Sequence, residues 1–319
     1  MRKFLIISAV FFLLSMIISP QSCYEAASEG LALWWNIIFP SLLPFFITAE
    51  ILLQLGALEN LGRRLEPLMR PLFRLPGAAA LAVLMGFCAG FPTGAAICAG
   101  LRQQELITRE EGERLISFTN NPSPLFILVA VSTGILAQPQ LGLLLLGINY
   151  GLNLLLGIIL GLFSPPSQGK QKTIRPITIK KATETRPGAI LRRAGQKAAS
   201  NITLVGCYII FFSCLTRMIE NSGFIALICR VLRLNPALGQ ALGGGFWEMS
   251  LGINHLAGFS LASQIALTAA ILAWSGFSVQ AQVAAMVSDT DIKVGKYIIC
   301  RAIHALASFA LATLILSNK

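Results

Sequence analysis

Long apolar segments follow one another along almost the whole chain, and this feature constrains the fold more than any other. Hydrophobic residues make up 55% of the 319 residues and charged residues only 12%, about half the charged share of a soluble domain. Such a chain cannot bury its apolar side chains in one core and still cover its surface with polar groups. Because a backbone in lipid must satisfy its hydrogen bonds within helices, the sequence predicts an all-α, multi-pass membrane protein.

The charge and the reactive residues exclude several classes of function. The net charge of +11 is typical of a membrane protein whose cytoplasmic loops are rich in Lys and Arg, so no nucleic acid is expected as a partner. The 7 Cys residues lack any C-x-x-C spacing and only 2 His residues are present, which favours neither disulfides nor a metal site. The sequence contains no nucleophile–base motif and no phosphate-binding loop, so we expect neither an enzyme nor a resident cofactor.

The N-terminal segment begins with Arg2 and Lys3 and continues into an apolar run over residues 4–18. It is similar to a signal peptide, but no cleavage site of the small-x-small type follows. We interpret the segment as a retained transmembrane helix whose basic start lies in the cytoplasm. Together with a short outer loop, it forms the first predicted region, residues 1–30.

Residues 31–163 form a predicted first membrane repeat. Three crossings are expected, over residues 31–55, 115–137 and 141–163. Between the first two, residues 77–101 are apolar but carry Gly and Pro at the centre, so we expect a re-entrant helical hairpin with its tip at residues 90–94. The polar residues 119–124 interrupt the second crossing, which is tolerable only where the break is buried in protein or lines a cavity.

Three local patterns add detail to this repeat. Leucines spaced three and four apart predict an interfacial amphipathic helix over residues 58–73. Thr108 and Glu111 have the spacing of a capping box that opens a helix. Small residues recur at the spacing that packs helices together, in Gly147-x-x-x-Gly151 and Gly157-x-x-x-Gly161.

Residues 164–197 are rich in Lys and Arg with Glu184 as the single acid, and we expect them to form a cytoplasmic linker. The same order of segments then recurs over residues 198–319. The expected crossings are 201–216, 260–287 and 294–316, with a glycine-broken hairpin over 237–258. Since three crossings are an odd number, the second repeat is upside down relative to the first, which predicts an inverted-topology repeat. The alignment of the repeats lays Asn36 on Asn201 and Asn149 on His304.

Inverted repeats with broken helices place a substrate site near the membrane midplane. The apolar segments are interrupted near residues 90–94, 119–124, 243–255 and 275–282, and we call these interruptions the first to fourth breaks. The candidate substrate-binding residues all lie at these four breaks: Thr93, Gly94, Asn120, Asn121, Ser123, Trp247, Glu248, Asn254, Gln280 and Gln282. Glu248 is the most informative, because a carboxylate inside an apolar segment marks a functional site by default. Two alternatives stay open: Glu248 forms an ion pair with Arg217 or Arg301, and the breaks are packing kinks.

The four breaks also carry a family resemblance. The stretches are Phe87-Cys-Ala-Gly-Phe-Pro-Thr-Gly-Ala95, Phe118-Thr-Asn-Asn-Pro-Ser-Pro124, Phe246-Trp-Glu-Met-Ser-Leu-Gly252 and Ser275-Gly-Phe-Ser-Val-Gln-Ala-Gln-Val283. They resemble those of the YlbJ-type sporulation integral membrane proteins. The resemblance implies the cell membrane of an endospore-forming Gram-positive bacterium, a link to spore cortex formation, and a nucleoside-recognition Gate domain shared with part of the concentrative nucleoside transporters. It assigns no residue roles.

Two functions are consistent with these observations. In the first, the chain transports a small polar, nucleoside-like solute by alternating access. The amides of the second and fourth breaks would bind the solute, and Glu248 would pair with a coupling cation (H⁺ or Na⁺) or a cationic substrate. In the second, the chain is a membrane scaffold or receptor in sporulation, and the basic segment recruits partners or anionic lipid. The lipid bilayer is a partner in both, and a homo-oligomer or other sporulation membrane proteins stay open.

Overall fold

The computed structural model describes residues 2–55, 57–165 and 187–317, and within these ranges the chain is helical and without strands. The helices up to residue 88 are α1 (Arg2–Ile18), α2 (Pro20–Leu33), the π-helical η1 (Trp34–Ile38), α3 (Phe39–Gln54), α4 (Ala57–Phe73) and α5 (Ala79–Cys88). Those up to residue 162 are α6 (Thr93–Gln103), α7 (Arg109–Thr119), the π-helical η2 (Phe126–Ile135), the 3₁₀ turn η3 (Pro139–Leu141) and α8 (Gly142–Leu162).

The remaining helices follow the undescribed residues 166–186, where most of the expected linker falls. They are α9 (Pro187–Asn221), α10 (Phe224–Leu232), α11 (Pro236–Trp247), α12 (Met249–Asn254), α13 (Leu261–Trp274), α14 (Gly276–Met286) and α15 (Gly295–Ser317). Among the described residues, five helical segments are long and apolar enough to cross a membrane: Pro20–Thr48, Pro139–Leu162, Pro187–Asn221, Leu261–Met286 and Gly295–Ser317. The prediction of an all-helical chain is confirmed for the described residues, and the five candidate spans agree with a multi-pass membrane protein.

Several local predictions agree with the structure. The Thr108 side chain accepts a hydrogen bond from the Glu111 backbone N–H, and the Glu111 side chain accepts one from the Thr108 backbone, so the capping box is present. The expected hairpin over residues 77–101 is a pair of packed helices, α5 and α6. The expected breaks near 119–124 and 275–277 separate α7 from η2 and α13 from α14.

Three expectations need correction. The short outer loop expected before residue 31 is helix α2, because its buried residues Cys23, Ala26, Gly30 and Leu33 recur at helical spacing and form one packed face. The last residues assigned to the linker, from Pro187 onward, already belong to α9. The glycines 243–245 do not break their helix; α11 continues through them and ends at Trp247.

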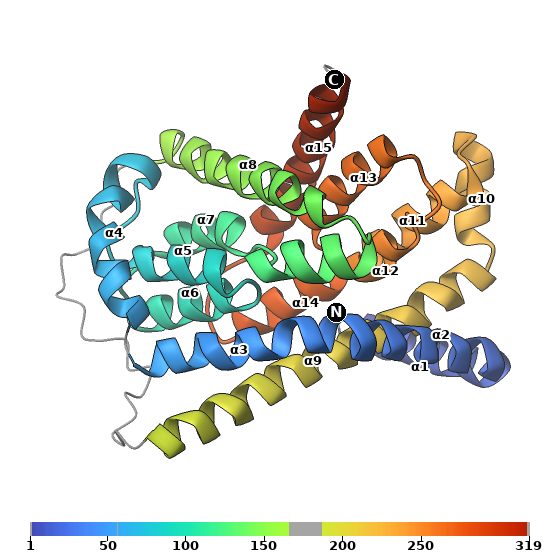
Figure 1. Ribbon diagram of the computed structural model, residues 1–319, viewed down its shortest axis with the longest axis horizontal. Helices are drawn as coiled ribbons and strands as arrows, with labels where there is room; N and C mark the ends of the chain where they lie inside the picture. Colours follow the sequence, from blue (N-terminus) through green and yellow to red (C-terminus); the bar gives the residue numbers. More distant parts are fainter. Residues whose placement is uncertain (1, 56, 166–186, 318–319) are drawn as a thin grey trace.

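The α2–η1–α3 segment runs antiparallel to the long helix α9 (Figure 1). The indole Nε1 of Trp34 donates to the Ile202 carbonyl at 3.0 Å in the middle of this contact. An ion pair closes each end, Arg217–Glu29 at 2.8 Å and Lys197–Glu50 at 3.0 Å. Residue numbers therefore rise along one segment as they fall along the other.

Helices α8 and α15 form a second antiparallel contact. A ring nitrogen of His304 (Nε2) lies 3.0 Å from the Asn149 carbonyl oxygen, and Arg301 donates to the side-chain oxygen of Asn153. The repeat alignment pairs Asn36 with Asn201 and Asn149 with His304. Asn149 and His304 form the second contact themselves, and Asn36 and Asn201 lie close in sequence to the residues that form the first.

Glycines allow close packing at some of the predicted positions only. A Cβ on Gly157 would lie 2.7 Å from the Phe118 ring, and one on Gly161 would lie 2.9 Å from the Phe73 backbone. Cβ atoms on Gly147 and Gly151 would meet nothing within 4 Å. The second small-residue face therefore packs helices within this chain, and the first does not.

A matched pair of Gly→Ala substitutions tests the packing. A Cβ at Gly86, on α5, would lie 1.8 Å from the Thr119 carbonyl oxygen, so we expect Gly86→Ala to displace α7 and lower both the folded yield and the melting temperature. Gly147→Ala adds the same methyl group in open space and should favour the helix by about 0.5–1 kcal/mol. Both are measured on detergent-purified protein; equal melting temperatures would contradict the packing of α5 on α7.

Candidate functional site

The α5–α6 tip meets the break after α7. The Phe91 backbone N–H donates to the Asn121 carbonyl at 2.9 Å. Gly90 has a φ of +78°, and a Cβ there would lie 2.7 Å from the Ser123 backbone nitrogen. Glycine is therefore required at this tip, both for its left-handed conformation and for the close approach.

The second half of the chain brings its two breaks together in the same way. Glu248 separates α11 from α12, and Ser275 separates α13 from α14. Gly276, with a φ of +74°, packs so closely against the first break that a Cβ would lie 3.0 Å from the Trp247 carbonyl oxygen and 3.2 Å from Glu248 Cα. Each half thus pairs one hairpin tip with one broken helix.

The two pairs face a common pocket that is bounded on its other sides by α3 and α9. The lining residues are Leu42, Phe46, Ala89, Gly90, Phe91, Ser123, Phe126, Val205, Tyr208, Ile209, Glu248, Met249, Ser250, Ser278, Val279 and Gln282. All four breaks that the sequence singles out contribute to this lining. The cavity volume is about 40 Å³, room for roughly three water-sized species, so a larger solute requires the pocket to widen.

Glu248 is buried in this pocket without a cationic partner. Its side chain is 3% exposed, and its Oε2 accepts a hydrogen bond from the Leu251 backbone N–H at 2.9 Å. Arg217 pairs with Glu29 and Glu220 instead, and Arg301 donates to oxygens on other elements. Among the described residues Glu248 forms no ion pair, so neither proposed salt bridge exists in this conformation.

Two further polar side chains of the lining lack partners. Gln282 is 5% exposed and Ser278 2% exposed, and within the described residues neither side chain has a hydrogen-bond partner. Ser250 lies beside the Glu248 carboxylate. All three side chains line the pocket, so their polar atoms are available to a ligand there.

The two asparagines of the second break bind protein groups. The Asn120 Oδ1 accepts from the Ala95 N–H at 3.0 Å near the start of α6, and its Nδ2 donates to the Ile116 carbonyl. The Asn121 Nδ2 donates to the Phe118 carbonyl, and its Oδ1 accepts from Asn153. Both side chains are fully buried outside the pocket lining. They hold the break in place.

The other predicted site residues are dispersed. Thr93 opens α6, and Gly94 packs against the Thr119 carbonyl, where a Cβ would lie 2.5 Å away. Trp247 packs with its neighbours in an aromatic cluster whose ring centroids are 4.8–5.6 Å apart, formed by Phe246, Trp247, Trp274 and Phe277. Gln280 donates to the Trp274 carbonyl at 3.3 Å, and Asn254 is exposed at the end of α12. Ser123, Glu248 and Gln282 are the predicted residues that line the pocket.

Sequence reasoning named Arg301 and His304 singly and missed that they belong to one buried polar face of α15. Tyr297, Arg301, His304 and Ser308 are each at most 2% exposed and recur at helical spacing. The Arg301 guanidinium donates to the carbonyls of Ser117 and Asn120 at the end of α7, where the negative end of the helix dipole favours a cation. The polar stripe along the last crossing was the available signal.

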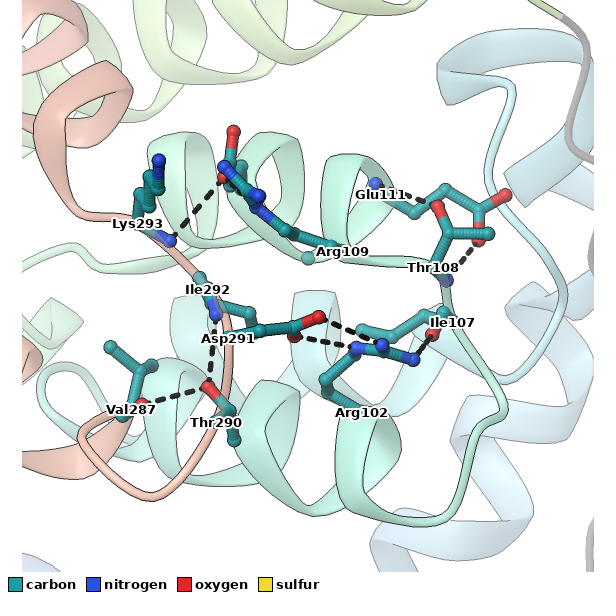
Figure 2. Close-up of polar contacts among 12 residues, drawn as sticks. Arg102, Ile107, Thr108, Arg109, Glu111, Val287, Thr290, Asp291, Ile292 and Lys293 are labelled. Carbon is teal, nitrogen blue, oxygen red and sulfur yellow. Dashed lines mark hydrogen bonds and ion pairs between the residues drawn. The ribbon is translucent and has the colours of Figure 1, made fainter.

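A polar connection joins the two halves away from the pocket (Figure 2). Arg102, at the end of α6, binds both carboxylate oxygens of Asp291 at 2.8 and 2.9 Å and also donates to the Ile107 carbonyl. The Lys293 backbone N–H donates to a carboxylate oxygen of Glu113. The α6–α7 loop and the α14–α15 loop are thereby tied together.

Comparisons with known proteins agree with the membrane fold. A family model described as Gate, nucleoside recognition, matches residues 36–164, from η1 to the end of α8. The sporulation integral membrane protein YlbJ of Bacillus subtilis (strain 168) is 38% identical over 320 residues, which cover 93% of this chain and 78% of that protein. No solved structure matches. The chain therefore belongs to the family of the sporulation integral membrane protein YlbJ.

Proposed function

We propose that the chain transports a small polar solute across the cell membrane of a spore-forming bacterium by alternating access, with the four-break pocket as the solute path. One observation carries the proposal: two breaks from each half of the chain converge on one buried pocket that holds an unpaired carboxylate. Broken helices are tolerated at membrane depth where they line such a cavity, and transporters use them to bind polar ligands.

The proposal includes an inverted repeat with two re-entrant hairpins. Its support is the antiparallel contact between α3 and α9 and between α8 and α15, which occupy equivalent places in the two halves. Asn149 and His304, which the alignment pairs, touch each other, as expected for residues beside a two-fold axis. Alternating access then corresponds to rocking of one repeat against the other around the pocket.

The family and the Gate match give the proposal its biological setting. The name of the relative refers to sporulation, and the matched model refers to nucleoside recognition. We propose that the solute is polar and nucleoside-like, that the N-terminus lies in the cytoplasm, and that transport contributes to formation of the spore cortex.

Ligand-induced stabilisation tests the proposal. Detergent-purified protein is heated with nucleosides, amino acids, dipeptides and cations, because a ligand that binds the folded state must stabilise it. We expect at least one polar solute to raise the melting temperature of the wild type and not that of Glu248→Gln. A panel without any shift, together with normal spore formation by Glu248→Gln, would favour the scaffold.

The Arg102–Asp291 ion pair ties the α6–α7 loop to the α14–α15 loop. If these loops close one face of the pocket, the ion pair must break each time that face opens during alternating access. Arg102→Glu places like charges opposite each other, so we expect a severalfold loss of spore yield in a host that lacks the gene. Arg102→Glu combined with Asp291→Arg restores the attraction and should restore the yield. A spore yield of the double variant as low as that of Arg102→Glu would show that the attraction between residues 102 and 291 is not required for function.

The same ion pair has a defined pH dependence. Hydrogen bonds from Arg102 hold the pKa of the Asp291 carboxyl below its usual range. The interaction is therefore complete at neutral pH and is lost as the pH falls through the lowered pKa. Because both side chains are partly or largely exposed, salt screens it, and its effect on thermal stability is small.

A further inference from the structure

We infer that the four-break pocket binds a sodium ion, with the Glu248 carboxylate, the Ser250 and Ser278 hydroxyls and the Gln282 side-chain carbonyl as ligands. The role of this ion rests on the proposed function, because the ion would be the cation whose movement is coupled to solute transport. The binding itself is a property of the folded chain and is tested without any solute.

The Glu248 carboxylate has no compensating charge among the residues that line the pocket. A buried carboxylate needs a compensating charge or a full set of hydrogen bonds. The described residues give Glu248 the Leu251 backbone N–H and contacts with Ser250, and no Lys, Arg or His residue lines the pocket. A cation that enters the pocket would supply the missing partner.

The polar side chains that line the pocket offer mainly oxygen ligands. Its polar side chains carry oxygen donors, and Gln282 adds one amide nitrogen: Ser123, Tyr208, Glu248, Ser250, Ser278 and Gln282. Carboxylate, hydroxyl and carbonyl oxygens bind hard cations, whereas neither Cys nor His, the common ligands of transition metals, is among the residues that line this pocket. Gln282 and Ser278 are more than nine-tenths buried and lack hydrogen-bond partners among the described residues, so their oxygens are free to coordinate an ion.

The volume of the pocket and its single carboxylate favour a small monovalent ion. A cavity of about 40 Å³ accommodates a small ion with one or two waters. Calcium takes six to eight oxygen ligands, usually with several carboxylates, and this lining has one carboxylate. The site lies between the C-terminal end of α11 and the N-terminal end of α12, whose first turn the Glu248 side chain caps. A monovalent ion matches the single carboxylate of the lining, and sodium is small enough to enter the cavity with one or two waters.

The experiment measures the melting temperature of the full chain in detergent while NaCl replaces choline chloride at constant ionic strength. We expect a saturable rise of about 3–6 °C with NaCl and no comparable rise with KCl. Glu248→Gln should abolish the rise, and Ser278→Ala should shift the half-saturating concentration upward by about tenfold. The matched controls are Glu29→Gln, an exposed carboxylate paired with Arg217, and Ser288→Ala in the exposed turn after α14; both should keep the full response.

Sodium NMR of the wild type gives a second readout if Glu248→Gln does not fold. We expect ²³Na line broadening that excess lithium reverses and potassium does not. Equal melting temperatures in NaCl and choline chloride, or an unchanged sodium response in Glu248→Gln, would overturn the sodium site. If sodium binds but no solute flux is measured, the sodium site stands and the proposed transport is wrong. If a pH gradient drives solute flux and sodium does not change that flux, transport stands and the sodium site is wrong.

Discussion

Glu248→Gln is expected to abolish the ability of the chain to support spore formation while the protein still folds and reaches the membrane. The substitution keeps the size of the side chain and an oxygen to accept the Leu251 N–H, so the cap of α12 survives. It removes the negative charge on which cation binding in the pocket depends. We expect spore yield in a host that lacks the gene to fall by about 100-fold or more, at unchanged membrane abundance.

Glu29→Gln is the control for this experiment. It removes a carboxylate that lies on the surface and binds Arg217, and exposed ion pairs contribute little. Its spore yield should stay close to that of the wild type. Normal yield in both variants would show that the pocket carboxylate has no function and would favour the scaffold interpretation.

Arg301→Leu has the largest expected effect on stability. Two effects oppose each other: the substitution removes a fully buried charge, which is favourable, and it leaves two α7 carbonyls and the Asn153 side-chain oxygen without a donor. Each unsatisfied buried group costs about 1–3 kcal/mol, and the carbonyls lie where α7 must end for the break to form. We therefore expect a net loss of roughly 3 kcal/mol or more and a clear fall in melting temperature.

Arg301→Lys and Arg230→Leu separate the causes. Lysine keeps the charge but has no planar fork to reach several acceptors, so its melting temperature should lie between those of the wild type and Arg301→Leu. Arg230 is exposed on α10, and its replacement should change stability by no more than about 0.5 kcal/mol. A melting temperature of Arg301→Leu equal to or above that of the wild type would mean that relief of the buried charge outweighs the lost hydrogen bonds.

The sequence predicted the breaks well because their causes are local. Polar residues in an apolar segment, Pro92 and Pro122, and the left-handed Gly90 and Gly276 act on their own stretch of backbone. The glycines 243–245 misled the prediction, because glycine in a helix has a second use. A Cβ on Gly245 would lie 2.9 Å from Ile271, so this glycine allows α13 to approach a continuous helix.

The roles of the polar side chains could not be read from the sequence in the same way. Asn120 and Asn121 look like ligands in a linear chain, yet their partners Ala95 and Asn153 come from distant segments. Gln282 faces the pocket and Gln280 does not, although both lie on α14. Tertiary contacts decide which amide is used to hold the break and which is left for a ligand.

Cysteine accessibility shows directly whether the pocket opens to both faces of the membrane. Ser278→Cys, in a background without the seven native Cys residues, is labelled with a membrane-impermeant maleimide in right-side-out and inside-out vesicles. Alternating access predicts labelling from both faces, at rates that a bound solute or sodium changes in opposite directions on the two faces. Labelling from one face only, unaffected by any ligand, would contradict alternating access through the pocket.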